Sequence, residues 1–263
     1  MMKIGFIGFG SMAKAIARGL IKEPTHQLFA AAPSLTKGIN AEGIQTYHDN
    51  KELVQQVEII ILAVKPSQMD KVINEINAHL SPSSLVISVA AGLSIEWFAN
   101  RFTKPYALIR TMPNTPASIG LGATPMFANT YVSRDHKQWA EAIFSSVGLT
   151  HWAKAEEEMD VFTALSGSGP AYVFLFVEAL TNAAIALGLE SAIAQKFALQ
   201  TCRGALKLAE NTNLSLSQLR TQVTSPGGTT AAALGVLEPQ LEGLIHKAMQ
   251  AAQIRAEELG KLD

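Results

Sequence analysis

The chain has 263 residues, 48% hydrophobic and 16% charged, a composition typical of one or two globular domains and not of a disordered segment. Lysine and arginine (21) nearly balance aspartate and glutamate (22), which gives no electrostatic reason to expect binding to nucleic acid or to an anionic membrane. The single cysteine excludes an internal disulfide, and we expect a cytoplasmic protein.

The first 150 or so residues alternate short β-branched runs with helical patterns, which predicts βαβ units and a parallel sheet. The predicted strands are Lys3–Ile7, Gln27–Ala31, Glu58–Leu62, Leu85–Ser88, Tyr106–Arg110 and Gly122–Ala128. The predicted helices of this part are Ser11–Lys22, Lys51–Val57, Ser67–His79, Ile95–Arg101 and Asp135–Val147. We therefore expect an α/β fold that begins with a doubly wound Rossmann-type sheet.

From Lys154 onward, alanine, leucine and glutamine recur at helical spacing. The predicted helices of this part are Ala171–Leu187, Ala192–Ala209, Ser215–Val223, Thr230–Leu237 and Leu241–Leu259. The sequence thus predicts two domains, a Rossmann-type domain over residues 1–153 and an all-α domain over residues 154–263. The run 171–189 approaches the length of a membrane span, but Glu178 and Asn182 lie near its middle, so we expect a helix buried between subunits.

The strongest local motif is Gly8-Phe9-Gly10-Ser11-Met12-Ala13, directly after the first strand. Gly8 permits a tight strand-to-helix turn, Gly10 leaves room for a pyrophosphate, and Ala13 allows close packing of the helix on the strand. The first amides of the helix point at the phosphates. In this position the motif predicts a dinucleotide site formed by Gly8, Phe9, Gly10, Ser11 and Met12, although a tight turn without a ligand remains an alternative.

The second strand indicates which dinucleotide binds. An NAD site usually has an acidic residue at the end of this strand, but Leu28–Ser34 contains none. Ser34 and Lys37 follow, and a hydroxyl and a cation suit a 2′-phosphate, although they are also ordinary loop residues. We expect NADPH as the cofactor, with NADH used less efficiently.

Two further strand ends are predicted to meet the same crevice. Ala63-Val64-Lys65-Pro66 follows the third strand and Ala90-Ala91-Gly92 follows the fourth. Ligands of doubly wound sheets bind outside the carboxyl ends of the strands, so we assign both segments to the cofactor site. Lys65 is expected to position the cofactor or cap a helix, without a catalytic role.

The helical part contains two glycine-rich helix starts, Ser166–Pro170 and Ser225–Thr230. Exposed amides and hydroxyls at such positions can receive a small carboxylate, although each segment could equally be a plain helix cap. The sequence has no nucleophile triad, no P-loop and no metal-ligand motif, and we expect no metal.

Three segments together resemble the pyrroline-5-carboxylate reductase family: Met112–Pro116, Leu165–Tyr172 and Thr224–Thr230. The resemblance extends from Lys3 to near the C-terminus. It implies reduction of 1-pyrroline-5-carboxylate to proline with NADPH, and a homodimer with interlaced α domains that can assemble into a larger ring. In the family, the loop matching Ser225–Gly228 completes the site of the partner subunit.

The resemblance also implies residue roles. Gly227, Gly228 and Thr229 would bind the substrate carboxylate, and Thr230 would hydrogen-bond the ring nitrogen. Asn50 matches a position that contacts the cofactor. The remaining residues assigned to the substrate site are Asn114, Ser168 and Gly169.

Two other functions stay open at this point. A β-hydroxyacid dehydrogenase shares the domain order, but it needs a lysine on the long helix, and Pro170–Leu189 has none. A non-catalytic module that senses NADPH would bind the cofactor tightly without turnover.

Overall fold

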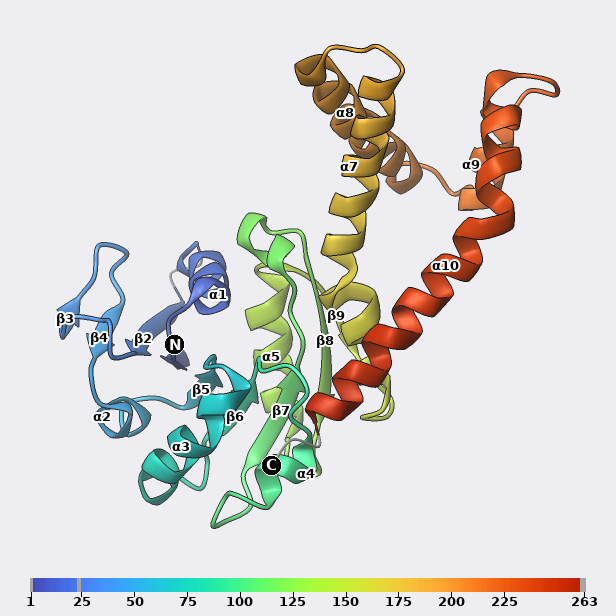
Figure 1. The fold of residues 1–263 in the computed structure, drawn as a ribbon. Coiled ribbons are helices and arrows are strands. Elements are labelled where there is room, and N and C mark those ends of the chain that lie inside the picture. The colour runs from blue at the N-terminus through green and yellow to red at the C-terminus, as the bar shows by residue number, and fades with distance from the viewer. Residues whose placement is uncertain (1, 23–24, 261–263) are drawn as a thin grey trace. The chain divides into compact units, whose positions relative to one another are not determined.

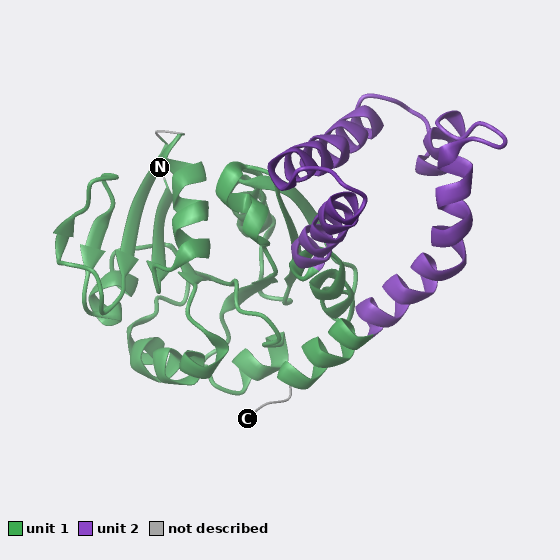
Figure 2. Ribbon diagram, turned by 45° about the horizontal axis from the view of Figure 1, so that its top comes forward, with its two compact units in different colours: residues 1–168, 251–263 green, residues 169–250 purple. Residues whose placement is uncertain are grey.

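The computed structural model describes residues 2–22 and 25–260 (Figure 1). The chain forms two compact units, one of residues 1–168 with 251–263 and the other of residues 169–250 (Figure 2). The domain boundary predicted between residues 153 and 154 stays a prediction. In the division into compact units, the chain leaves the first unit after Ser168 and returns to it at Ala251.

The first unit contains a sheet of nine strands among the described residues, in the order β3-β4-β2-β1-β5-β6-β7-β8-β9. The strands are β1 (Met2–Ile7), β2 (His26–Ala31), β3 (Gly38–Ile39), β4 (Gln45–Tyr47), β5 (Ile59–Leu62), β6 (Leu85–Ser88), β7 (Ala107–Thr111), β8 (Gly122–Ala128) and β9 (Gly148–Trp152). The five strands from β2 to β7 in this order are parallel, which confirms the predicted Rossmann-type core. β8 pairs antiparallel with β7, and β3 pairs antiparallel with β4, so the sheet is mixed.

Helices cover both faces of this sheet. α1 (Ser11–Ile21) and α5 (Arg134–Ser145) pack with one set of strand side chains, which includes Ile4 and Phe6 of β1. α2 (Asn50–Val54), α3 (Pro66–Ile76) and α4 (Ile95–Ala99) pack with the opposite set, which includes Ile7. Because successive strand residues point to opposite faces, a strand covered on both sides must be continuously apolar. The run 59–62 of β5 meets this requirement, and all four of its residues are fully buried.

The second unit is helical. It contains α7 (Gly169–Ala186), α8 (Ser191–Glu210), α9 (Leu216–Gln222) and most of α10 (Thr229–Leu259). The predicted break between Leu237 and Leu241 is wrong, because α10 continues through Pro239. A proline inside a helix removes one backbone donor, and the alanine- and leucine-rich flanks keep the helix intact on both sides.

The segment of the first unit that precedes α7 also differs from expectation. α6 (Glu158–Phe162) leads into a π-helical turn, Thr163–Gly167, which adjoins α7. Ser168 N–H donates to the Thr163 carbonyl at 2.8 Å, which is the spacing of a π-helix. Pro170 lies in the first turn of α7, as predicted, but the segment before it is helical and its amides are not all free as the sequence predicted.

The helical unit leaves apolar side chains uncovered. None of the residues of α7, all of which are described, is buried. Phe174 and Leu175 are 69% and 65% exposed. The stretch Glu158–Ala186 is long and apolar enough, by length and composition alone, to cross a membrane. Such a surface requires a cover, which is either lipid or protein.

Candidate active site

The turn after β1 requires glycine at its first position. Gly8 has a φ of +83°, and a Cβ there would lie 2.7 Å from the Ala63 carbonyl oxygen and from the Val64 side chain. Its N–H donates to the Ala31 carbonyl at 2.8 Å. This one residue therefore joins the carboxyl ends of β1, β2 and β5, and any larger residue would separate them.

Gly10 has a different reason to be glycine. It is the N-cap of α1, it has an extended backbone, and it provides no side-chain cap to the helix. A Cβ added there would meet nothing within 4 Å, so the space in front of the helix is open. The first amides of α1 lack intrahelical partners. Open space beside unpaired amides and the positive end of a helix dipole fits a dinucleotide pyrophosphate.

The loop after β2 places Ser34 and Lys37 at the surface. Lys37 Nζ lies 2.7 Å from Glu52 Oε2, and the hydrogen bond and charge of Glu52 raise the Lys37 pKa above its ordinary value. The cation is thus available for a 2′-phosphate, but a carboxylate competes for it. The sequence reasoning did not consider two further cations of α1, Lys14 and Arg18. They line a hollow of about 280 Å³ together with Phe9 and Leu35.

The strand ends β5 and β6 carry the other predicted cofactor residues. Lys65 is the exposed N-cap residue of α3 and Pro66 is in its first turn. Both line a hollow of about 850 Å³. Ala90 is buried, and its N–H donates to Ser88 Oγ at 3.2 Å. Asn50, at the start of α2, donates through Nδ2 to Glu75 at 2.9 Å, which fixes its side chain.

Asn114 links the loop after β7 to the π-helical turn. Its Nδ2 donates to the Ser166 carbonyl at 2.9 Å, and its Oδ1 accepts from Ala123 N–H at 2.9 Å. Pro170 has no N–H, so the Ser166 carbonyl, four residues earlier, has no α-helical donor. Asn114 supplies the missing donor. Its amide is therefore occupied in holding this turn, and its assignment to the substrate stays a prediction.

Two of the groups expected to be free near Pro170 are occupied as well. The Ser168 N–H donates to Thr163, and Ser166 Oγ donates to the Phe162 carbonyl at 2.9 Å. Gly167 packs against Met112, whose Cε would lie 2.9 Å from an added Cβ. The π-helical turn thus holds Ser168 by these contacts and leaves no open helix N-terminus before Gly169.

The second glycine-rich segment does open a helix. α10 begins at Thr229, and Gly228 N–H donates to the Ser225 carbonyl at 3.0 Å in the preceding turn. Gly227 has a φ of +73°, and an added Cβ would meet nothing within 4 Å. Thr229 is exposed and Thr230 is half-buried. Apart from the Gly228 N–H, the first amides of this helix lack intrahelical partners, and the space beside Gly227 is open, which is what an anion needs.

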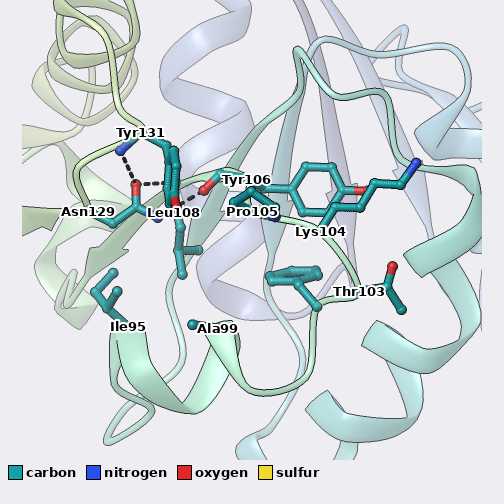
Figure 3. Close-up of a pocket in the computed structure, with 10 residues that line it drawn as sticks. Ile95, Ala99, Thr103, Lys104, Pro105, Tyr106, Leu108, Asn129 and Tyr131 are labelled. Carbon is teal, nitrogen blue, oxygen red and sulfur yellow. Dashed lines mark hydrogen bonds between the residues drawn. The ribbon is translucent and has the colours of Figure 1, made fainter.

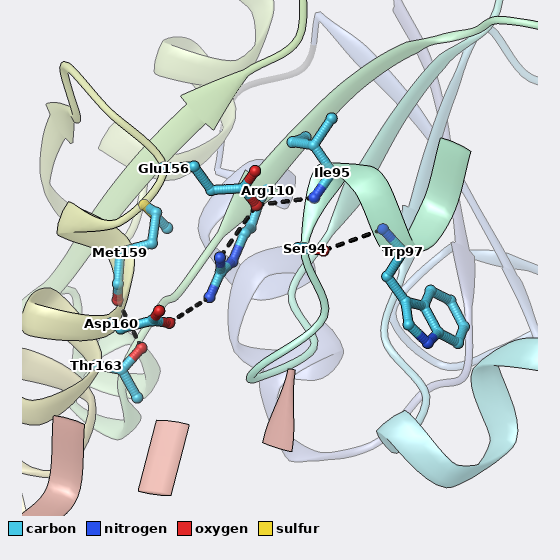
Figure 4. A network of polar contacts seen from close by, with 8 residues as sticks. All are labelled: Ser94, Ile95, Trp97, Arg110, Glu156, Met159, Asp160 and Thr163. Carbon is cyan, nitrogen blue, oxygen red and sulfur yellow. Dashed lines mark hydrogen bonds and ion pairs between the residues drawn. The ribbon is translucent and has the colours of Figure 1, made fainter. Parts of the chain in front are cut away.

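A buried ion-pair cluster supports the end of β7 (Figure 4). Arg110 is almost fully buried and donates to Glu156 at 3.1 Å and to Asp160 at 2.7 Å. Glu156 also accepts the Ile95 N–H at 2.8 Å. One guanidinium therefore joins β7, the start of α4 and the segment before the π-helical turn.

A hollow of about 310 Å³ lies at the opposite, amino end of β7 (Figure 3). The side chain of Asn129, one of several polar residues that line it, accepts from Leu108 N–H and Tyr131 N–H and donates to the Tyr106 carbonyl. Because ligands of such sheets bind at the carboxyl ends, and because Asn129 already makes three hydrogen bonds to the backbone, this hollow is not the cofactor site.

Known proteins resemble the chain over its whole length. Residues 156–259 match the family model described as pyrroline-5-carboxylate reductase dimerisation, and residues 3–92 match the one described as NADP oxidoreductase, coenzyme F420-dependent. Pyrroline-5-carboxylate reductase of Synechocystis is 42% identical over 267 residues, which cover 99% of each chain.

Solved structures agree with this result. A pyrroline-5-carboxylate reductase from Coxiella burnetii has a TM-score of 0.90 and 40% identity, with 99% of each chain covered. The pyrroline carboxylate reductase of Plasmodium falciparum, solved with NADP bound, has a TM-score of 0.88 and 33% identity, with 98% of each chain covered.

Proposed function

The chain belongs to the pyrroline-5-carboxylate reductase family, and we propose from this that it reduces 1-pyrroline-5-carboxylate to L-proline with NADPH, the last step of proline biosynthesis. The observation that carries the proposal is the conjunction of full-length similarity with the open, uncapped helix start at Gly10. The second unit lies within the region that matches the dimerisation family, so oligomerisation is part of this function.

NADPH, when bound, supplies a hydride from its nicotinamide ring. We assign the pyrophosphate to the turn Gly8–Met12, and the 2′-phosphate to Ser34 and Lys37. The segments Ala63–Pro66 and Ala90–Gly92, with Asn50, are assigned to the remaining contacts of the cofactor. The small residues in these segments, Ala63, Ala90, Ala91 and Gly92, let the backbone approach the ribose and the nicotinamide closely.

Gly227, Gly228 and Thr229 are assigned to the substrate carboxylate, and the hydroxyl of Thr230 to the ring nitrogen. The Gly228 N–H already donates to the Ser225 carbonyl, so the amides proposed to face the carboxylate are those of Gly227 and Thr229. Ser168 and Gly169 complete the substrate contacts in this proposal, and Asn114 positions them through Ser166. A protonated cyclic imine is already electrophilic, so the protein mainly has to align it with the cofactor. That requirement agrees with a site of amides and hydroxyls that has few ionisable groups.

We further propose a homodimer with interlaced α domains, in which the Ser225–Thr230 segment of one subunit completes the site of its partner, with a larger ring of dimers as the next level. The apolar surface of α7, none of it buried, supports a protein cover. Glu178 and Asn182 near its middle oppose a lipid cover, because a charge at the bilayer centre is unfavourable. We propose a cytoplasmic location on the same grounds.

The proposed reaction is tested by following NADPH oxidation after addition of 1-pyrroline-5-carboxylate, with L-proline identified as the product. Turnover with a β-hydroxyacid would instead favour the dehydrogenase alternative. Tight NADPH binding with neither turnover would favour the sensing module. Wild-type protein that binds NADPH but produces no proline would refute the proposal.

The assignment of Thr230 is tested separately. Thr230→Val removes the hydroxyl at nearly constant shape, and we expect kcat to fall on the order of tenfold, since one neutral hydrogen bond that strengthens in the transition state is lost. Thr230→Ser should retain most activity. The matched control is Thr221→Val, because Thr221 donates only to the Ser217 carbonyl of its own helix. NADPH affinity should not change in these variants.

Thr230→Val with the kcat and KM of the wild type would show that this residue acts only in the helix start.

A further inference from the structure

The loop after β6 is in direct backbone contact with the end of α10, within the first unit. Gly92 has a φ of +84°, and a Cβ there would lie 2.8 Å from Leu259 Cβ. A Cβ at Gly260 would in turn lie 2.6 Å from the Gly92 carbonyl oxygen. Both positions therefore exclude a side chain, and the two backbones fit together only as glycine against glycine.

The contact is localised on the last turn of the helix. Among the residues of α10, all of which are described, Ala256 alone is buried, with 3% of its surface exposed. Ala256 and Gly260 line a hollow of about 390 Å³ together with Gly92 and Arg110. Leu259 lines the hollow of about 850 Å³ that also contains Lys65. The turn thus contributes to both hollows beside the ends of β5, β6 and β7.

We propose that this turn, Ala256–Gly260, is a positioning segment for the cofactor loop Ala90–Gly92. The inference rests on the proposed function, which assigns that loop to NADPH. A loop that contains a glycine in the left-handed region has large conformational freedom, and fixing it in advance reduces the ordering that cofactor binding would otherwise require. The same helix begins at Thr229, so one continuous element joins the oligomerisation unit to this loop.

Two pairs of variants test the proposal. Ala256→Glu places a charged side chain at the buried contact, and Ala251→Glu makes the same change at an exposed position of the same helix. Gly92→Ala introduces the Cβ that meets Leu259. Gly43→Ala is its control, because Gly43 has a φ of +78° but nothing within 4 Å of an added Cβ. Both alanine variants place a side chain at a positive φ and therefore share the backbone strain. Only Gly92→Ala also introduces a steric contact, the one with Leu259.

The readouts are the NADPH dissociation constant, from titration of nicotinamide fluorescence, and hydrogen exchange of the amides of residues 89–93. We expect Ala256→Glu and Gly92→Ala each to weaken NADPH binding about tenfold, the size of effect expected when a preorganised loop must be ordered on binding. Exchange at residues 89–93 should become faster in both. Each control should stay within about twofold of the wild type by the same reasoning.

The double variant separates positioning from direct obstruction of the cofactor. If the turn holds the loop, Gly92→Ala should weaken NADPH binding little further once Ala256→Glu has displaced the turn. Independent, multiplying effects would overturn the proposal, and so would unchanged NADPH affinity in Ala256→Glu. Should Ala256→Glu fail to fold, Gly260→Ala replaces it, because Gly260 is not assigned to the cofactor and its added Cβ would lie 2.6 Å from the Gly92 carbonyl oxygen. Unchanged NADPH affinity in Gly260→Ala would overturn the proposal.

Wild-type turnover of 1-pyrroline-5-carboxylate is measured in parallel. Absence of that turnover would count against the proposed function, whereas the binding comparison would still decide the role of the turn.

Discussion

Replacing Arg110 by methionine should destabilise the first unit strongly. The Arg110 side chain is 5% exposed, and its partners Glu156 and Asp160 are 23% and 16% exposed, so solvent screens these pairs little. Methionine fills much of the same volume but leaves two carboxylates without their cation. Removing one partner of a buried ion pair destabilises a protein by about 3–5 kcal/mol. We expect about 3 kcal/mol, the lower end of that range, because both carboxylates retain some contact with water.

The measurement is chemical or thermal unfolding at one fixed protein concentration, since association adds to apparent stability. A loss of 3 kcal/mol corresponds to a fall in Tm of roughly 6–12 °C for a chain of this size. Arg255→Met is the control, because the Arg255–Glu258 pair is 62% and 54% exposed, and exposed pairs contribute about 0–1 kcal/mol.

Arg110→Lys should recover only part of the lost stability. The guanidinium reaches Glu156 and Asp160 through two separate nitrogens, and an ammonium group has only one. If Arg110→Met were no less stable than Arg255→Met, the ion-pair cluster would not support the end of β7, and the reasoning would be wrong.

Three further outcomes are expected. Lys37→Ala should lower the preference in kcat/KM for NADPH over NADH about tenfold, because the contact of Lys37 with the 2′-phosphate is lost. Glu52→Gln removes the competing carboxylate and should raise this preference. An unchanged preference in both variants would exclude a contact between Lys37 and the phosphate. The unfolding midpoint should rise with protein concentration, because a dimer coupled to folding obeys mass action, and a concentration-independent midpoint would contradict such coupling in the proposed dimer. Burial lowers the pKa of His136, so protonation of this residue opposes folding. The stability that neutral His136 contributes is present above about pH 6.5 and is lost as the pH falls below that value. In His136→Gln, glutamine can still form the capping box with Ser133 but does not titrate. The fall in Tm between pH values above and below about 6.5 should therefore be smaller in this variant.

The sequence was sufficient to predict the parallel core of the sheet and the tight glycine turn after β1. The strands β1, β5 and β6 are apolar on both faces, and Gly8 and Gly10 follow directly after β1, so short-range pattern and fold agree there. β3 and β4 were missed because strands of two and three residues show no alternation. β9 was missed because it is half-exposed at the edge of the sheet, where burial imposes little pattern.

The partners of charged residues were beyond sequence reasoning for a different reason. Lys37, in the loop after β2, was predicted as a cation suited to a 2′-phosphate, yet Glu52, 15 residues later, lies 2.7 Å from it. Arg110 and Glu156 are separated by 46 residues. Such pairs depend on how strands and helices pack, and nothing in the local pattern of either residue indicates its partner.

The segment before α7 shows how a local pattern misleads when a distant residue decides the outcome. Serine, glycine and proline each favour a helix start, so Ser166–Pro170 predicted an open N-terminus. A helix that continues up to Pro170 leaves the Ser166 carbonyl without its donor, and a buried carbonyl without a partner is unfavourable by about 1–3 kcal/mol. Asn114, 52 residues earlier, removes that penalty. This amide therefore stabilises the π-helical turn. Asn114→Leu should loosen the turn that carries Ser168, and faster hydrogen exchange of the Ser168 amide would report this effect.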